Sequence, residues 1–132
     1  NSGEYQLAVE SLLKALKLKE EMGDKKGIAN ACNNLSVVFK EQKNYKQSAL
    51  LFDKVLSSSS SEDPDILYNA SCVYSLNGEI KVAINYLNIL ADKYFYSDQD
   101  HISADADLEN LHQLEEWKSL LEKVIKNSDR TT

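Results

Sequence analysis

The sequence has little proline and little glycine. One Pro and four Gly occur among 132 residues. Chains built from β-strands need such residues at their many tight turns, so their scarcity argues against an all-β protein and favours long helices. No apolar run approaches the roughly 18–20 residues that a membrane helix needs, and the first residues show no secretory signal pattern. We therefore expect an all-α protein that does not enter a membrane.

Cysteine and histidine are also scarce. Cys32 and Cys72 are the only cysteines, and both lie inside apolar helical patterns. This disfavours a disulfide framework and favours a reducing compartment, so we expect a cytoplasmic protein. His101 and His112 stand apart from any ligand at metal-binding spacing, and the chain has no glycine-rich phosphate loop and no nucleophile elbow. We expect no metal, no cofactor and no enzymatic activity.

The charge is distributed unevenly along the chain. Residues 1–56 carry nine Lys and seven acidic residues, which gives +2, whereas residues 98–132 carry three Lys, one Arg and nine acidic residues, which gives −5. Binding to nucleic acid needs several Lys or Arg side chains on one face, and no segment has such a stripe. We therefore exclude nucleic acid as a partner. The overall charge of −6 with 42% hydrophobic residues is typical of a folded chain, and the length suits one domain.

Apolar residues recur at steps of three and four, the spacing of amphipathic helices. In the first helix this pattern places Leu12, Leu13 and Leu16 on one buried face. Gly23, Asn44 and Asn77-Gly78 are expected to end helices, and Asp63-Pro64 is expected to start one. The serines at 57–61 predict a loop. The predicted helices cover residues 3–22, 25–43, 45–56, 64–76 and 79–94, with two short ones at 103–112 and 114–125.

Two helix pairs repeat each other with a shift of 35 residues. Small residues recur in both pairs, and large apolar residues follow them at matching positions. Small residues let two antiparallel helices approach closely, and the large ones fill the space beside them. The matching motifs are Cys32-x-x-Leu35-Ser36-x-x-Phe39 with Leu67-x-x-Ala70-Ser71-x-x-Tyr74, and Tyr45-x-x-Ser48-x-x-x-Phe52-x-x-Val55 with Ile80-x-x-Ala83-x-x-x-Leu87-x-x-Leu90.

These motifs resemble the tetratricopeptide repeat. The resemblance implies a right-handed solenoid of helical hairpins with C-terminal capping helices, forming a single domain over residues 1–132. Its parts would be the second helix of a truncated repeat at 3–22, repeats at 25–57 and 63–93, and a capping segment at 101–126. Because the first helix would lack its partner, we expect further repeats before Asn1, or a homodimer through this exposed helix.

The resemblance also implies a function, which is the binding of another protein. A peptide or helix of the partner would lie in the concave groove formed by the first helix of each pair. Amide side chains suit this task because they donate and accept hydrogen bonds at once. The alternative is a structural or oligomerisation element of a larger protein. The expected groove residues are Asn30, Asn33, Asn34, Val37 and Glu41 on one helix, with Asp65, Tyr68, Asn69 and Cys72 on the other.

The acidic residues between positions 98 and 109 allow three interpretations. Asp98, Asp100 and Glu109 have part of the spacing of a calcium loop, but Ile102 and Ser103 stand where a ligand and a glycine are needed. Asp105-Ala106-Asp107 resembles a sugar-nucleotide transferase triplet without the surrounding fold. The favoured interpretation is a helix start capped by Asp105 or Asp107. Trp117 further along is expected to plug the core rather than bind a ligand.

Overall fold

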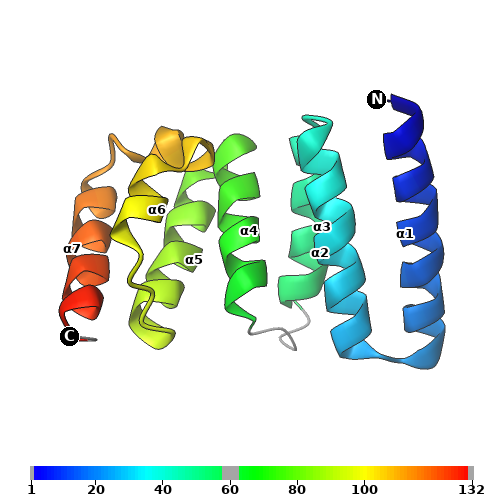
Figure 1. The fold of residues 1–132 in the computed structure, drawn as a ribbon, viewed down its shortest axis with the longest axis horizontal. Coiled ribbons are helices and arrows are strands. Elements are labelled where there is room, and N and C mark those ends of the chain that lie inside the picture. Colours follow the sequence, from blue (N-terminus) through cyan, green and yellow to red (C-terminus); the bar gives the residue numbers. More distant parts are fainter. Residues whose placement is uncertain (1, 58–62, 131–132) are drawn as a thin grey trace. The chain divides into compact units, whose positions relative to one another are not determined.

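The computed structural model describes residues 2–57 and 63–130, and these residues form helices and no strand (Figure 1). Of the helices in this part of the chain, none has the length and apolar character needed to cross a membrane. The chain divides into two compact units, Asn1–Ile66 and Leu67–Thr132. The single repeat domain expected over residues 1–132 stays a prediction. The helices are α1 (Ser2–Met22), α2 (Lys25–Glu41), α3 (Tyr45–Ser57), α4 (Pro64–Leu76), α5 (Ile80–Lys93), α6 (Gln99–Ala104), the 3₁₀ helix η1 (Ala106–Leu111) and α7 (Glu115–Arg130).

In the first unit, α2 packs against both α1 and α3. The predicted helix boundaries are confirmed to within two residues, and Gly23 ends α1 with a φ of 66°. Of the loop expected at 57–61, only Ser57 lies among the described residues, where it ends α3. The core of this unit is made of apolar side chains from all three helices. These include Leu16, Cys32, Leu35, Ala49, Phe52 and Val55, each at most 6% exposed.

Two serines hold α2 against α3. The Ser48 hydroxyl donates to the Ser36 carbonyl oxygen at 2.8 Å, and the Ser36 hydroxyl donates to the Ser48 carbonyl oxygen at 3.3 Å. Both serines are fully buried. Only a small side chain allows the backbones to come close enough for these reciprocal bonds. The close approach predicted from the small residues of this pair is therefore confirmed.

The turn between α2 and α3 differs from the sequence-based expectation. The residue with positive φ is Lys43, at 63°, rather than Asn44. Asn44 instead precedes α3, and its side-chain oxygen accepts the Gln47 backbone N–H at 3.4 Å. Lys43 and Gly78, which has a φ of 81°, are separated by the 35-residue repeat shift. A lysine thus occupies a turn position that suits glycine.

The apolar surface of α1 is broader than one face. Leu16 is buried and Leu12 is half-buried, as predicted, but Leu13 is 48% exposed. The expectation that Leu13 lies on the buried face is therefore wrong, because this residue lies beyond the contact with α2. Leu7, Leu18 and Met22 are also exposed.

The second unit contains most of α4, with α5, α6, η1 and α7. Asp63, just before α4, accepts the Asp65 backbone N–H at 2.9 Å, so the predicted start at Asp63-Pro64 is confirmed. Ser71 and Ala83 are fully buried, as small residues of the repeat pattern should be. The Tyr74 ring is also buried and stacks on Tyr86 with a centroid distance of 5.8 Å.

The C-terminal segment differs most from its prediction. The short helix expected at 103–112 is two elements, α6 and η1, separated at Asp105, and the last helix extends to Arg130 instead of ending at 125. Trp117 is buried as predicted, with its ring 4.5 Å from that of His112. Helix α7 packs on α5, and its buried positions follow the same spacing of three, four and three residues as Ile80, Ala83, Leu87 and Leu90 of α5, of which Ile80 is half-buried and the other three are buried. They are Trp117, Leu120, Val124 and Asn127.

Candidate functional site

One face of α2 carries the expected groove residues of the first unit. Asn30, Asn34, Val37 and Glu41 recur at steps of four, three and four, which places them in one stripe along the helix. The two amides and the carboxylate are exposed, whereas Val37 is half-buried. Asn33 lies at the edge of this stripe and is half-buried. The stripe therefore presents polar groups to solvent.

A pocket of about 370 Å³ opens between α1 and α2 at the N-terminal end of the stripe. Asn30 and Asn34 belong to its lining, and Leu12, Ala15 and Ala31 give it an apolar part. A volume of this size can hold one or two side chains of a bound segment. The charged residues of the lining are Lys19, Asp24 and Lys26.

The wall of this pocket depends on how α2 begins. The Asp24 carboxylate accepts the Gly27 backbone N–H at 2.9 Å and lies 3.5 Å from the Lys19 ammonium group. The hydrogen bond from Gly27 and the charges of Lys19 and Lys26 hold the pKa of Asp24 below its usual value. A β-carbon on Gly27 would lie 2.6 Å from both the Asp24 carboxylate and the Lys19 side chain. A side chain at position 27 would therefore displace the Asp24 carboxylate or the Lys19 side chain from these positions.

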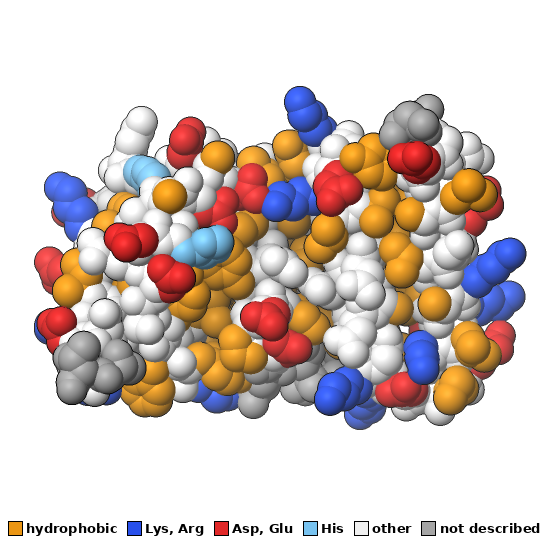
Figure 2. Space-filling view, viewed as in Figure 1, with side chains coloured by type: hydrophobic (Ala, Val, Ile, Leu, Met, Phe, Trp, Pro, Cys, Tyr) orange, Lys and Arg blue, Asp and Glu red, His pale blue; other side chains and the backbone are white. Residues whose placement is uncertain are grey.

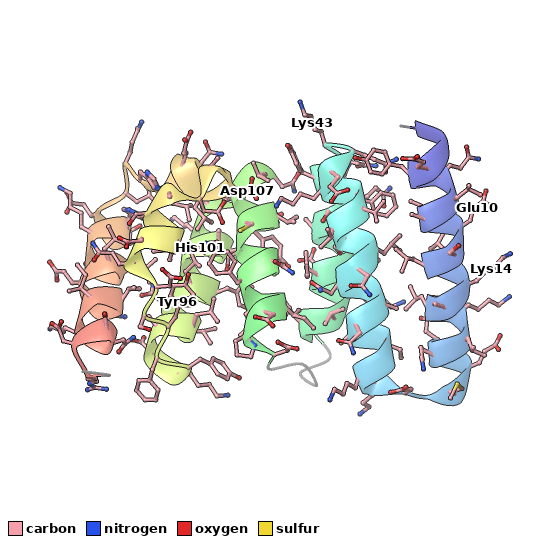
Figure 3. All side chains as sticks on the ribbon, viewed as in Figure 1. Glu10, Lys14, Lys43, Tyr96, His101 and Asp107 are labelled. Atoms are coloured by element: carbon pink, nitrogen blue, oxygen red, sulfur yellow. The ribbon has the colours of Figure 1, made fainter. Side chains whose placement is uncertain are left out.

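The expected groove residues on α4 have other surroundings. Asp65 is exposed in the first turn of α4, and Asn69 is half-buried. Tyr68 and Cys72 contact the segment that follows α5, which Figure 3 marks with Tyr96, His101 and Asp107. Cys72 is only 3% exposed, so it offers no surface to a partner. The expectation that Cys72 lies in an open groove is therefore wrong, because the segment that contains Asp105 covers the thiol.

Asp105 connects this segment to α4. One carboxylate oxygen, Oδ2, accepts the Tyr68 hydroxyl at 2.8 Å and the Cys72 thiol at 3.6 Å. The other, Oδ1, accepts the Asp107 backbone N–H at 3.0 Å and so caps η1. The capping role predicted for Asp105 is confirmed. Its contacts with α4 were not predicted, because the two segments are more than 30 residues apart in sequence.

Aromatic rings extend this contact. The Tyr96 ring stacks on Tyr68 with a centroid distance of 5.7 Å, and the His101 ring lies 5.3 Å from the Tyr68 ring. Burial, followed by the hydrogen bond to Asp105, raises the pKa of the Tyr68 hydroxyl far above its usual value. Burial and the charge of Asp98 raise the pKa of Tyr96 to about 12. Both phenols therefore stay neutral and act as packing and hydrogen-bonding groups.

Cys72, Asp105 and Asp107 could in principle hold a cation, since their ligand atoms lie within 4.8 Å of one another. The carboxylate of Asp105, however, already accepts three donors from the protein. We therefore assign this cluster a structural role.

Figure 2 shows acidic side chains beside the histidines over α6 and η1. Cys32, the other thiol, is fully buried in the first unit, and burial raises its pKa.

The predicted site residues thus separate into two groups. Five lie together on α2, and the other four lie along α4, where the division between the two units falls. Sequence reasoning missed the pocket residues contributed by α1 and by the α1–α2 turn. Lys19 and Leu12 are seven residues apart, a spacing that places them on one side of a helix, but nothing in the sequence marks that side as the wall of a pocket.

Comparisons with protein-family models, with curated proteins and with solved structures gave no match for this chain.

Proposed function

We propose that this protein is a protein–protein interaction module of the tetratricopeptide-repeat type, not an enzyme. In this proposal the repeats form a right-handed solenoid, and a peptide or helix of the partner binds along α2. The two buried thiols, Cys32 and Cys72, suit a reducing compartment such as the cytoplasm.

The observation that supports this proposal is the pocket beside Asn30 and Asn34. Each exposed amide can donate to a carbonyl and accept from an N–H of an extended peptide. The apolar lining from Leu12, Ala15 and Ala31 can bury one side chain of that peptide. Peptide-binding sites usually combine polar groups that bond to the peptide backbone with an adjacent apolar pocket for one of its side chains.

The pocket is small, which limits the expected affinity. A peptide that buries less than a standard interface binds in the micromolar range, or about −8 kcal/mol. Loss of one amide that bonds to the peptide backbone costs about 1–1.5 kcal/mol, or roughly tenfold in affinity.

Selection from a random-peptide display library tests this function. We expect the protein to select peptides with a shared apolar residue, and the double variant Asn30→Ala/Asn34→Ala to bind them at least about tenfold more weakly by fluorescence anisotropy. The matched control is Glu10→Ala/Lys14→Ala on α1, whose labelled side chains point away from α2 in Figure 3. Equal affinity for both double variants would refute the assignment of the site to α2.

A second candidate function is self-association through α1. Leu7, Leu18 and Met22 are 66%, 55% and 62% exposed, and their spacing of eleven and four residues places them on one side of the helix. Exposed leucines aligned in this way are typical of helix–helix interfaces. Leu12 and Leu16 contribute to the side that packs on α2, so they are unsuitable for testing this contact.

Light scattering over a concentration series tests self-association. If α1 forms a dimer, Leu18→Lys should yield monomers, whereas Leu13→Lys should not, because Leu13 lies about 140° around the helix from Leu18. A wild-type protein that stays monomeric at the highest concentration would eliminate this candidate.

A further inference from the structure

A second pocket, of about 240 Å³, lies in the second unit between the C-terminal end of α5 and the last turns of α7. Lys123, Lys126 and Arg130 line it from α7, and Asp92 is the only acidic residue of the lining. The pocket therefore has a formal charge of +2, in a chain whose net charge is −6. The positive charge of the pocket is thus opposite in sign to the net charge of −5 that residues 98–132 carry.

The basic side chains of the pocket have different partners within the protein. The Lys123 ammonium group is held 3.1 Å from the Asp92 carboxylate and 3.0 Å from the Asn88 side-chain oxygen. Arg130 lies over the Phe95 ring, with the guanidinium carbon 5.7 Å from the ring centroid. The charge of Asp92 thus neutralises that of Lys123, and Lys126 and Arg130 give the pocket its net positive charge.

Phe95 gives the pocket an exposed aromatic wall. Phe95 is 55% exposed and its φ is 56°, a backbone conformation that bulky residues rarely adopt. The Asn127 side chain fixes the backbone on both sides of this residue, because it donates to the carbonyl oxygens of Ala91 at 2.9 Å and Tyr96 at 3.0 Å. Asn127 is itself buried, which makes these bonds strong constraints. The fold therefore holds an apolar ring beside two cations in solvent.

We propose that this pocket binds an acidic peptide segment of a partner protein, with a carboxylate between Lys126 and Arg130 and an apolar side chain against Phe95. Arginine can donate two parallel hydrogen bonds to a carboxylate while its charge lies over an aromatic ring. Charge complementarity selects the peptide, since its acidic residues would be repelled by most of this protein's surface. The site is separate from the pocket between α1 and α2, and it does not depend on the function proposed for that pocket.

Fluorescence anisotropy with defined peptides tests this inference. The probe is the labelled peptide EDELDED, and the neutral peptide QNQLNQN is its control. We expect the acidic peptide to bind the wild-type chain, to bind more weakly as salt is added, and to bind Lys126→Glu at least about tenfold more weakly. Lys118→Glu is the matched control, because it makes the same change of charge at an exposed position of α7 outside the pocket.

Three outcomes would overturn the proposal: no binding of the acidic peptide at millimolar concentration, equal binding of the neutral peptide, or equal losses in Lys126→Glu and Lys118→Glu. Phe95→Asn separates binding from folding, because asparagine tolerates a positive φ. We expect this variant to keep or raise the melting temperature while the affinity for EDELDED falls. Unchanged affinity in Phe95→Asn would contradict the role of the ring.

Discussion

Replacement of Asp105 by alanine should loosen the C-terminal segment from α4. The carboxylate accepts the half-buried Tyr68 hydroxyl at 2.8 Å and caps η1 through the Asp107 N–H at 3.0 Å. Both acceptors are lost in Asp105→Ala. The Tyr68 hydroxyl then remains in a half-buried position without this partner.

The magnitude follows from these two contacts. A hydrogen bond to a charged group contributes about 1.5–3 kcal/mol, and loss of a capping side chain costs about 1 kcal/mol. We therefore expect Asp105→Ala to lower the free energy of unfolding by about 3 kcal/mol. In a double-mutant cycle with Tyr68→Phe, the coupling energy should be about 1–2 kcal/mol, because each single variant already breaks the same bond.

Urea unfolding followed by tryptophan fluorescence measures this effect. Trp117 is the only tryptophan of the chain and is buried in the second unit, so its emission reports on that unit. Asp100→Ala is the matched control, since Asp100 is an exposed acidic residue of the same segment, and its loss should cost less than about 0.5 kcal/mol. A stability of Asp105→Ala equal to that of Asp100→Ala would refute the reasoning.

Three further predictions use other parts of the fold. Lys43→Gly should raise the free energy of unfolding by about 0.5–1 kcal/mol because glycine adopts a positive φ without strain, whereas Gly78→Ala should lower it by about 1 kcal/mol. Changes of the opposite sign, measured by chemical denaturation, would contradict this reasoning. Ala83→Leu should cost about 1–3 kcal/mol by overpacking a fully buried position, and a wild-type melting temperature would count against it. Tyr96 should stabilise the fold fully below pH 10, its unfolded value, and lose this contribution as the pH rises through about 12. The alkaline unfolding transition should therefore move to higher pH in Tyr96→Phe, and an unchanged transition would argue against the raised pKa.

The local signals of the sequence predicted the helices well. Gly23, Asp63-Pro64 and Gly78 mark boundaries that the structure confirms, because capping and positive φ depend on a few neighbouring residues. The turn conformation was expected at Asn44, although the alignment of the repeats already places Lys43 at the position of the turn glycine Gly78. Both residues are compatible with a turn, and the position of Gly78 one repeat later is the signal that favours Lys43 as the residue with positive φ.

The contacts between distant segments were harder to predict. Asp105 was recognised as a cap, which is a local property, but its bond to Tyr68 joins residues 37 apart in sequence. No periodicity reports such a contact, so Cys72 was expected in an open groove although the same segment covers it. Lys123, Lys126 and Arg130 recur at helical spacing in the sequence. Residues 98–132 carry only four basic residues against nine acidic ones, so the net charge of this segment did not indicate that three of the basic residues line one pocket on α7.

The two asparagines of α2 provide the most direct test of the proposed function. Side-chain amide signals of Asn30 and Asn34 can be followed by NMR while a peptide selected from the library is added. We expect these two signals to shift in step with the anisotropy change, since both amides line the pocket beside α1. Saturating peptide that leaves both signals in place, and shifts resonances elsewhere, would contradict the assignment of the binding site to α2.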